Sequence, residues 1–159
     1  NQVCDLTARQ PYLLQCLCNR IFDLAAQLKT RTVTLDLVEK ATDMLVEDNE
    51  HFASLWDYVH TDRRRFLLAL FEKETDTQDP LRLGIIQEKL LSYGIEITDD
   101  VLIEDLEFLY EMELIKLVGE TNDGHYQIAI PMMGTWIHRQ QDFSALKSKA
   151  MDETEDQNA

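Results

Sequence analysis

The stretch that decides the fold runs from residue 98 to residue 136 and reads TDDVLIEDLEFLYEMELIKLVGETNDGHYQIAIPMMGTW. From Thr98 to about Met112 its apolar residues recur at helical spacing, behind a threonine that can cap a helix. Two apolar strands follow, Leu114–Val118 and His125–Ile130, with the turn sequence Thr-Asn-Asp-Gly at 121–124 between them. The stretch therefore predicts a helix followed by an antiparallel hairpin.

Two more helices directly before this stretch and one after it are predicted to belong to the same unit. The first begins after Thr61, and the second begins at Asp79-Pro80 and ends at Tyr93-Gly94, where glycine suits a left-handed C-cap. A closing helix covers 132–140. Three helices with short connections and then a hairpin are the order of a winged helix-turn-helix domain. We therefore predict a winged helix over 61–142, with the two-stranded β-hairpin as its wing.

The residues on either side of this unit predict a helical bundle and a tail. Helices starting at Pro11, after Thr34 and at His51 are expected to form a small bundle over 1–60. Because this bundle has few apolar layers and the chain opens on Asn1 without an initiator methionine, we expect a piece of a larger protein. Residues 143–159 are acidic towards their end, and we expect a disordered tail there. The predicted fold class is thus mainly α, a small helical bundle followed by a winged helix.

The charge of the chain disfavours nucleic acid as a partner. Thirty acidic and fifteen basic residues give a formal net charge of −15. The helix that would enter a DNA groove carries six carboxylates that could instead dock a protein: Asp99, Asp100, Glu104, Asp105, Glu107 and Glu111. DNA binding relies on Lys and Arg neutralising phosphates, so these carboxylates oppose it. They form either a protein-docking surface or a solvated face. The basic cluster Arg63-Arg64-Arg65 contacts phosphate, forms a helix-capping surface patch or pairs with the acidic helix.

Several short motifs resemble a known family of nucleotide switches. Residues 7–18 (TARQPYLLQCLC) followed by 33–38 (VTLDLV) resemble the end of the helical lid in AAA-type and STAND-type ATPases. Phe52-x-x-Leu55-Trp56, residues 126–131 (YQIAIP) and Trp136-Ile137 are similar to the winged helix that follows this lid. The resemblance implies an upstream ATPase module in the same chain, which would bind ATP or ADP.

In that family the residues before the lid helix lie near the nucleotide phosphates, which here are Arg9, Gln10 and Pro11. A helix N-terminus with unpaired N–H groups gives a physical reason for this. Position 9 is usually glycine in the family, so Arg9 either adds a cation beside the nucleotide or marks the loss of that contact.

No catalytic or metal-binding site is predicted. The chain lacks a Gly-x-x-x-x-Gly-Lys-Ser/Thr phosphate loop, so we expect no ATPase activity from it alone and no cofactor of its own. Its four histidines have no metal-ligand spacing, and Cys4, Cys16 and Cys18 are expected to be buried free thiols in a reducing cytoplasm. No apolar run has transmembrane length, so no membrane partner is expected.

The sequence thus predicts a regulatory role. We expect a non-catalytic protein-interaction region that relays or restrains the nucleotide state of an upstream ATPase module through protein contacts. A DNA-binding winged helix and a protein-docking adaptor unrelated to ATPases are the alternatives.

Overall fold

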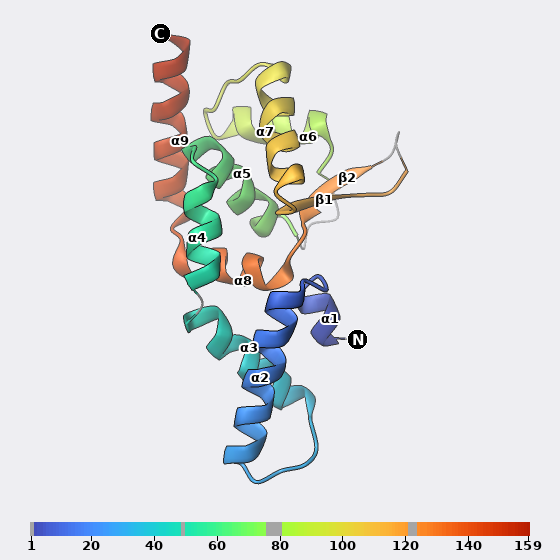
Figure 1. Cartoon of the computed structure of the whole chain (residues 1–159). Helices are drawn as coiled ribbons and strands as arrows, with labels where there is room; N and C mark the ends of the chain where they lie inside the picture. Colours follow the sequence, from blue (N-terminus) through green and yellow to red (C-terminus); the bar gives the residue numbers. More distant parts are fainter. Residues whose placement is uncertain (1, 49, 76–80, 121–123) are drawn as a thin grey trace.

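The chain is mainly helical, with one small antiparallel sheet (Figure 1). A computed structural model describes residues 2–48, 50–75, 81–120 and 124–159. Its helices in chain order are α1 (Gln2–Leu6), α2 (Pro11–Gln27), α3 (Leu35–Asp48), α4 (Glu50–Tyr58), α5 (Asp62–Lys73), α6 (Leu83–Ser92), α7 (Asp99–Glu111), α8 (Pro131–Gln140) and α9 (Phe143–Asn158). The strands β1 (Ile115–Val118) and β2 (His125–Ile128) lie between α7 and α8.

Threonine caps fix the starts of three helices as the sequence predicted. The hydroxyl oxygen of Thr34 accepts a hydrogen bond from the Leu37 N–H at 3.3 Å, before α3. Thr61 and Thr98 do the same for the third residue after each of them, before α5 and α7. Each cap satisfies one of the N–H groups that a helix start leaves without a partner in the helix.

The C-cap predicted for α6 is also confirmed, because Gly94 has φ +83°. The predicted N-cap at Asp79-Pro80 lies outside the described residues, and α6 begins at Leu83.

The predicted hairpin is present. Strand β1 pairs antiparallel with β2, with Ile115 opposite Ile128, and both of these side chains are buried. The second strand ends two residues before the predicted Ile130, because Pro131 there starts α8. The predicted turn at 121–124 falls largely outside the described residues.

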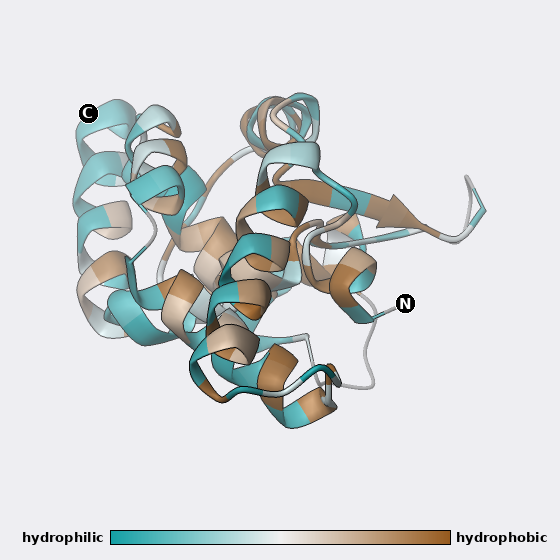
Figure 2. Ribbon diagram, turned by 60° about the horizontal axis from the view of Figure 1, so that its bottom comes forward, coloured by the Kyte–Doolittle hydropathy of each residue, from teal (hydrophilic) through white to brown (hydrophobic). Residues whose placement is uncertain are grey.

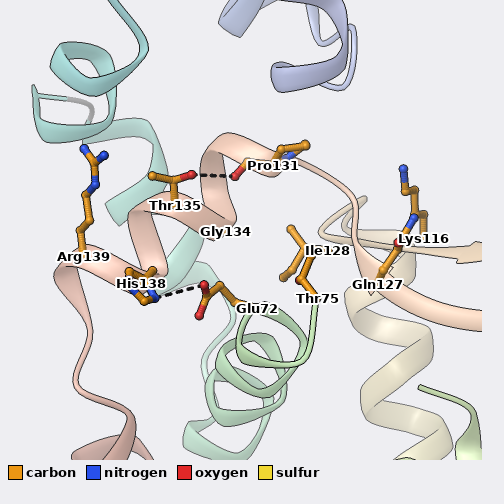
Figure 3. Close-up of a pocket in the computed structure, with 10 residues that line it drawn as sticks. All are labelled: Glu72, Thr75, Lys116, Gln127, Ile128, Pro131, Gly134, Thr135, His138 and Arg139. Carbon is orange, nitrogen blue, oxygen red and sulfur yellow. Dashed lines mark hydrogen bonds and ion pairs between the residues drawn. The ribbon is translucent and has the colours of Figure 1, made fainter. Parts of the chain in front are cut away.

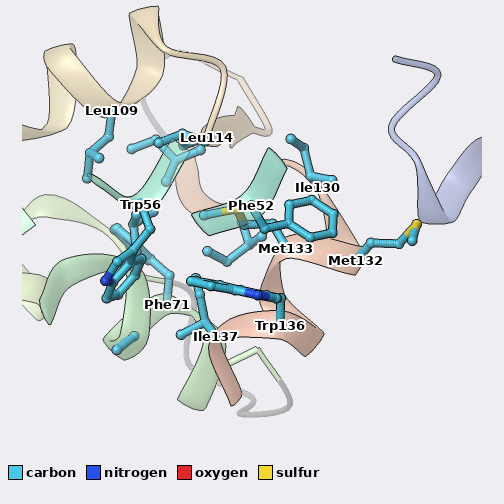
Figure 4. Packing of buried hydrophobic residues seen from close by; sticks show 14 of the residues in the cluster. Phe52, Trp56, Phe71, Leu109, Leu114, Ile130, Met132, Met133, Trp136 and Ile137 are labelled. Atoms are coloured by element: carbon cyan, nitrogen blue, oxygen red, sulfur yellow. The ribbon is translucent and has the colours of Figure 1, made fainter. Parts of the chain in front are cut away.

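One continuous hydrophobic cluster runs from α2 to α9, and α8 lies at its centre (Figure 4). Phe52 and Trp56 of α4 pack on Trp136 of α8, with ring centroids 6.4 Å and 5.7 Å apart. Arg139, near the end of α8, donates a 2.6 Å hydrogen bond to Asp43 of α3. Helix α8 therefore joins the first helices of the chain to α5 and the hairpin.

The predicted disordered tail is wrong, because residues 143–158 form helix α9. Its side chains Leu146, Ala150 and Thr154 are buried at four-residue spacing, and α9 packs along α5 (Figure 1). Phe143 also packs on Phe66, with ring centroids 5.1 Å apart. Asp152, Glu155 and Asp156 are exposed, whereas Glu153 accepts a hydrogen bond from the Arg63 N–H of α5. The composition of this segment therefore resembled that of a disordered tail, while its spacing was that of a helix.

In the described parts of the chain, no helix combines the length and the apolar character needed to cross a bilayer.

Candidate functional site

The acidic helix α7 divides into an exposed acidic face and one buried carboxylate. Asp105 is 0% exposed, and the guanidinium groups of Arg63 and Arg64 both donate to it. Arg64 Nε lies 2.8 Å from Asp105 Oδ1, and Arg63 Nη2 lies 3.2 Å from the same oxygen. Asp105 is therefore unavailable for docking, and its prediction as a docking residue is wrong. The other five predicted docking residues are exposed: Asp99, Asp100, Glu104, Glu107 and Glu111.

The same contacts settle which alternative holds for the basic cluster. Arg63 also donates from Nη1 to Gln157 Oε1 of α9 at 2.7 Å, and Arg64 stacks its guanidinium 4.0 Å from the centroid of the Phe108 ring. Arg65 pairs with Asp62 within its own helix. Because all three arginines have protein partners, pairing with carboxylates describes this cluster better than contact with phosphate does.

Two of the three residues predicted to lie near nucleotide, Arg9 and Gln10, line a groove between the start of α2 and the hairpin. We call it the Arg9 groove, and its cavity volume is about 560 Å³. Its lining residues are Cys4, Asp5, Ala8, Arg9, Gln10, Glu113, Lys116, Ala129 and Pro131. Pro11 is exposed and starts α2, but it does not line the groove. The groove thus brings α1 and the turn before α2 together with two elements that lie far from them in the sequence, β1 and the start of α8.

A tight left-handed turn positions Arg9. Ala8 and Arg9 have φ +49° and +59°, and the Arg9 N–H donates to the carbonyl oxygen of Cys4 at 3.0 Å. A left-handed backbone is costly for residues other than glycine, which explains why glycine would be the easier choice at position 9. The arginine keeps the turn and adds an exposed cation to the groove.

Two helix starts border the Arg9 groove. Helices α2 and α8 both begin with proline, and Gln10 and Pro131 at these starts are among the lining residues. Among the described residues, neither helix has a side-chain N-cap. The positive ends of two helix dipoles therefore lie at one groove, where they favour an anion.

The charged side chains of the groove balance one another. Two cations, Arg9 and Lys116, and two carboxylates, Asp5 and Glu113, line the same cavity. An anion placed beside the two cations would gain from them and from the helix starts. Lys116 was not predicted, because a single lysine in an apolar strand gives no signal before the strand is placed beside the turn that precedes α2.

A second hollow continues the Arg9 groove along α8, because both are lined by Lys116 and Pro131 (Figure 3). We call it the His138 hollow. His138 Nδ1 lies 3.2 Å from Glu72 Oε1 of α5, and its side chain is 73% exposed. At Gly134, an added Cβ would lie no closer than 3.7 Å to the nearest side chain. The hollow is lined by both polar and apolar side chains, and its cavity volume is about 530 Å³.

The other candidate residues form no reactive centre. Within the described residues no group of three or more His, Cys, Asp or Glu is placed to hold a metal ion. The three cysteines are free thiols, but the prediction that they are buried is wrong, because Cys18 is exposed and Cys4 and Cys16 are only half-buried. The side-chain hydrogen bond between Tyr12 and Cys16 raises the pKa of Tyr12, and burial lowers the pKa of His51, whose ring lies 4.9 Å from that of Tyr12.

No known family, curated protein or solved structure matches the chain.

Proposed function

We propose that this chain is the non-catalytic, regulatory part of a nucleotide-dependent switch, and that the Arg9 groove is the place where nucleotide phosphates act on it. The observation that carries the proposal is the convergence of Arg9, Lys116 and the starts of α2 and α8 on one groove. Cations and helix starts are the groups that proteins use to bind phosphate. The resemblance of 7–18 to the lid of AAA-type and STAND-type ATPases supports the same placement.

In this proposal, α5, α6, α7, the hairpin and α8 form a winged helix used for protein contact. Its order of helices and strands supports that assignment. The Arg9 groove is lined by the turn before α2 and by β1, so a phosphate bound there would contact both parts of the molecule. Movement of one against the other would relay the nucleotide state to an ATPase module or a partner.

The pairing of Arg63 and Arg64 with Asp105 weighs against the DNA-binding alternative, because it occupies the basic cluster on the winged unit. An electrophoretic shift at low salt with random duplex DNA tests this alternative, and we expect no shift. A shift that disappears on adding salt would favour a DNA-binding module instead.

The proposal is tested by ADP binding to the protein as its gene encodes it. Arg9→Glu is expected to weaken ADP binding by about tenfold or more, as loss of a charged hydrogen bond does. Lys40→Glu makes the same charge change on the exposed side of α3 and should leave affinity unchanged. Equal affinities for both variants would contradict the proposal. If the protein that the gene encodes lacks a phosphate loop, the alternative of a protein-docking adaptor unrelated to ATPases is favoured.

A further inference from the structure

An apolar groove runs along α2, and it shares no residue with the Arg9 groove. We call it the α2 groove. Its lining residues are Val3, Cys18, Ile21, Phe22, Ala25, Ala26, Thr30, Arg31 and Val33, and its cavity volume is about 570 Å³. Phe22 is 74% exposed and Val33 is 58% exposed. Large apolar side chains gathered at one exposed site mark an interaction surface more often than chance exposure.

The groove is lined by α1, α2 and the loop before α3. The end of α2 and this loop lie at the bottom of the molecule in Figure 1, which is the side brought forward in Figure 2. Two further exposed apolar residues, Leu28 and Leu35, lie at the ends of that loop.

The spacing along α2 selects a helix as the occupant. Residues 18, 21, 22, 25 and 26 repeat at intervals of three and four, which is the stripe that one helix presents to another. Two of these positions are alanines, so a second helix can approach closely there. Helices bound in such grooves insert aliphatic anchors spaced three, four and seven residues apart.

The charges around the groove select the polar face of that helix. Arg31 lines the groove, and within the described lining there is no carboxylate. Lys29 and Arg31 are the only charged residues between Leu28 and Leu35, in a chain whose net charge is −15. Acidic side chains beside the apolar anchors would therefore find cations here, whereas basic ones would meet like charge.

We propose that the α2 groove binds an acidic amphipathic helix of a partner protein. Its aliphatic side chains fill the space between Phe22 and Val33, and its carboxylates pair with Arg31 and Lys29. This inference deepens the proposed function, on which it rests for the idea of a relay through protein contacts. The α2 groove and the Arg9 groove are lined by different residues, so the two sites can be tested separately.

A second copy of this chain is the competing occupant. Helix α7 exposes Ile103 and Tyr110 among its carboxylates, which is an acidic amphipathic face. Two copies would each bring a net charge of −15, and that repulsion opposes their association. We therefore assign the groove to a different protein.

The test uses two designed helical peptides that share one leucine stripe and carry either glutamate or lysine beside it. Fluorescence anisotropy with the whole 159-residue chain, without nucleotide, measures their affinities. The glutamate peptide should bind about tenfold more tightly than the lysine peptide, since complementary and like charges differ by about that factor at an interface. Reversing Lys29 and Arg31 to glutamate should invert the order. The same reversal at the exposed Lys40 and Lys149 is the control and should leave the order unchanged.

A second pair of variants tests how much the apolar side chains of the α2 groove contribute to peptide binding. Phe22→Glu should weaken the glutamate peptide by about tenfold or more, as removal of a buried aromatic anchor does. Leu91→Glu, at another exposed apolar side chain on α6, should leave binding unchanged. Circular dichroism of each variant verifies that the fold persists.

Three results would overturn the assignment. These are absence of binding by the glutamate peptide, equal binding of the two peptides, and a dimer in sedimentation that Phe22→Glu abolishes. Since nucleotide is absent from these measurements, failure of peptide binding would leave the ADP test of the Arg9 groove untouched, and the reverse also holds.

Discussion

At the scale of single residues, Asp105 of α7 accepts hydrogen bonds from Arg63 and Arg64 of α5, and Arg63 also reaches Gln157 of α9. Asp105→Ala leaves the buried Arg63 and the half-buried Arg64 without their counterion. Breaking such a pair on one side costs about 3–5 kcal/mol of the free energy of unfolding. We expect a loss of that order in chemical denaturation followed by circular dichroism.

Asp100→Ala is the matched control, because Asp100 lies on the same helix and is exposed. It should change the free energy of unfolding by no more than about 0.5 kcal/mol. Similar losses for the two variants would mean that Asp105 is a surface carboxylate like its neighbours, contrary to the structure.

His51 gives the fold a dependence on pH. Burial lowers its pKa from the ordinary value, so the unfolded chain binds a proton more readily than the folded chain does. The stability contributed by neutral His51 is therefore complete above about pH 6.5, the unfolded value, and is lost as the pH falls below it. In His51→Gln, the free energy of unfolding should decline less between pH 7 and pH 5 than in the natural chain. An unchanged slope would show that His51 does not titrate differently on folding.

At the scale of elements, residues 143–158 form the helix α9, whereas their acidic composition predicted a disordered tail. Leu146 is buried where α9 packs along α5. Leu146→Ala should therefore cost about 2–5 kcal/mol of the free energy of unfolding, as core truncations do. The exposed Lys149→Ala on the same helix should be close to neutral. A disordered tail would give no effect for either substitution, and thermal or chemical denaturation distinguishes the two cases.

At the scale of the whole molecule, the parts that could be predicted are those fixed by neighbours in the sequence. Thr61 and Thr98 cap helices through hydrogen bonds three residues away, and Gly94 ends one through its own backbone. The hairpin was predicted from two apolar strands on either side of a turn sequence, and the strands pair as expected. These features need no knowledge of where distant segments lie.

The features that could not be predicted depend on contacts between distant segments. Counting carboxylates in α7 gave no sign that Asp105 meets Arg63 and Arg64, because those arginines lie about forty positions earlier in the chain. Of the candidate site, Arg9 and Gln10 were identified, but Lys116 was missed because β1 had to be placed beside the turn before α2 first.

The central claim, that nucleotide acts on this chain through the Arg9 groove, is tested most directly by hydrogen exchange. The gene-encoded protein is compared with and without ADP, and in the Arg9→Glu variant. We predict that ADP slows exchange at residues 9–14 and 115–117, that α9 does not change, and that Arg9→Glu abolishes the difference. Bound ADP that leaves exchange at both segments unchanged would contradict the claim.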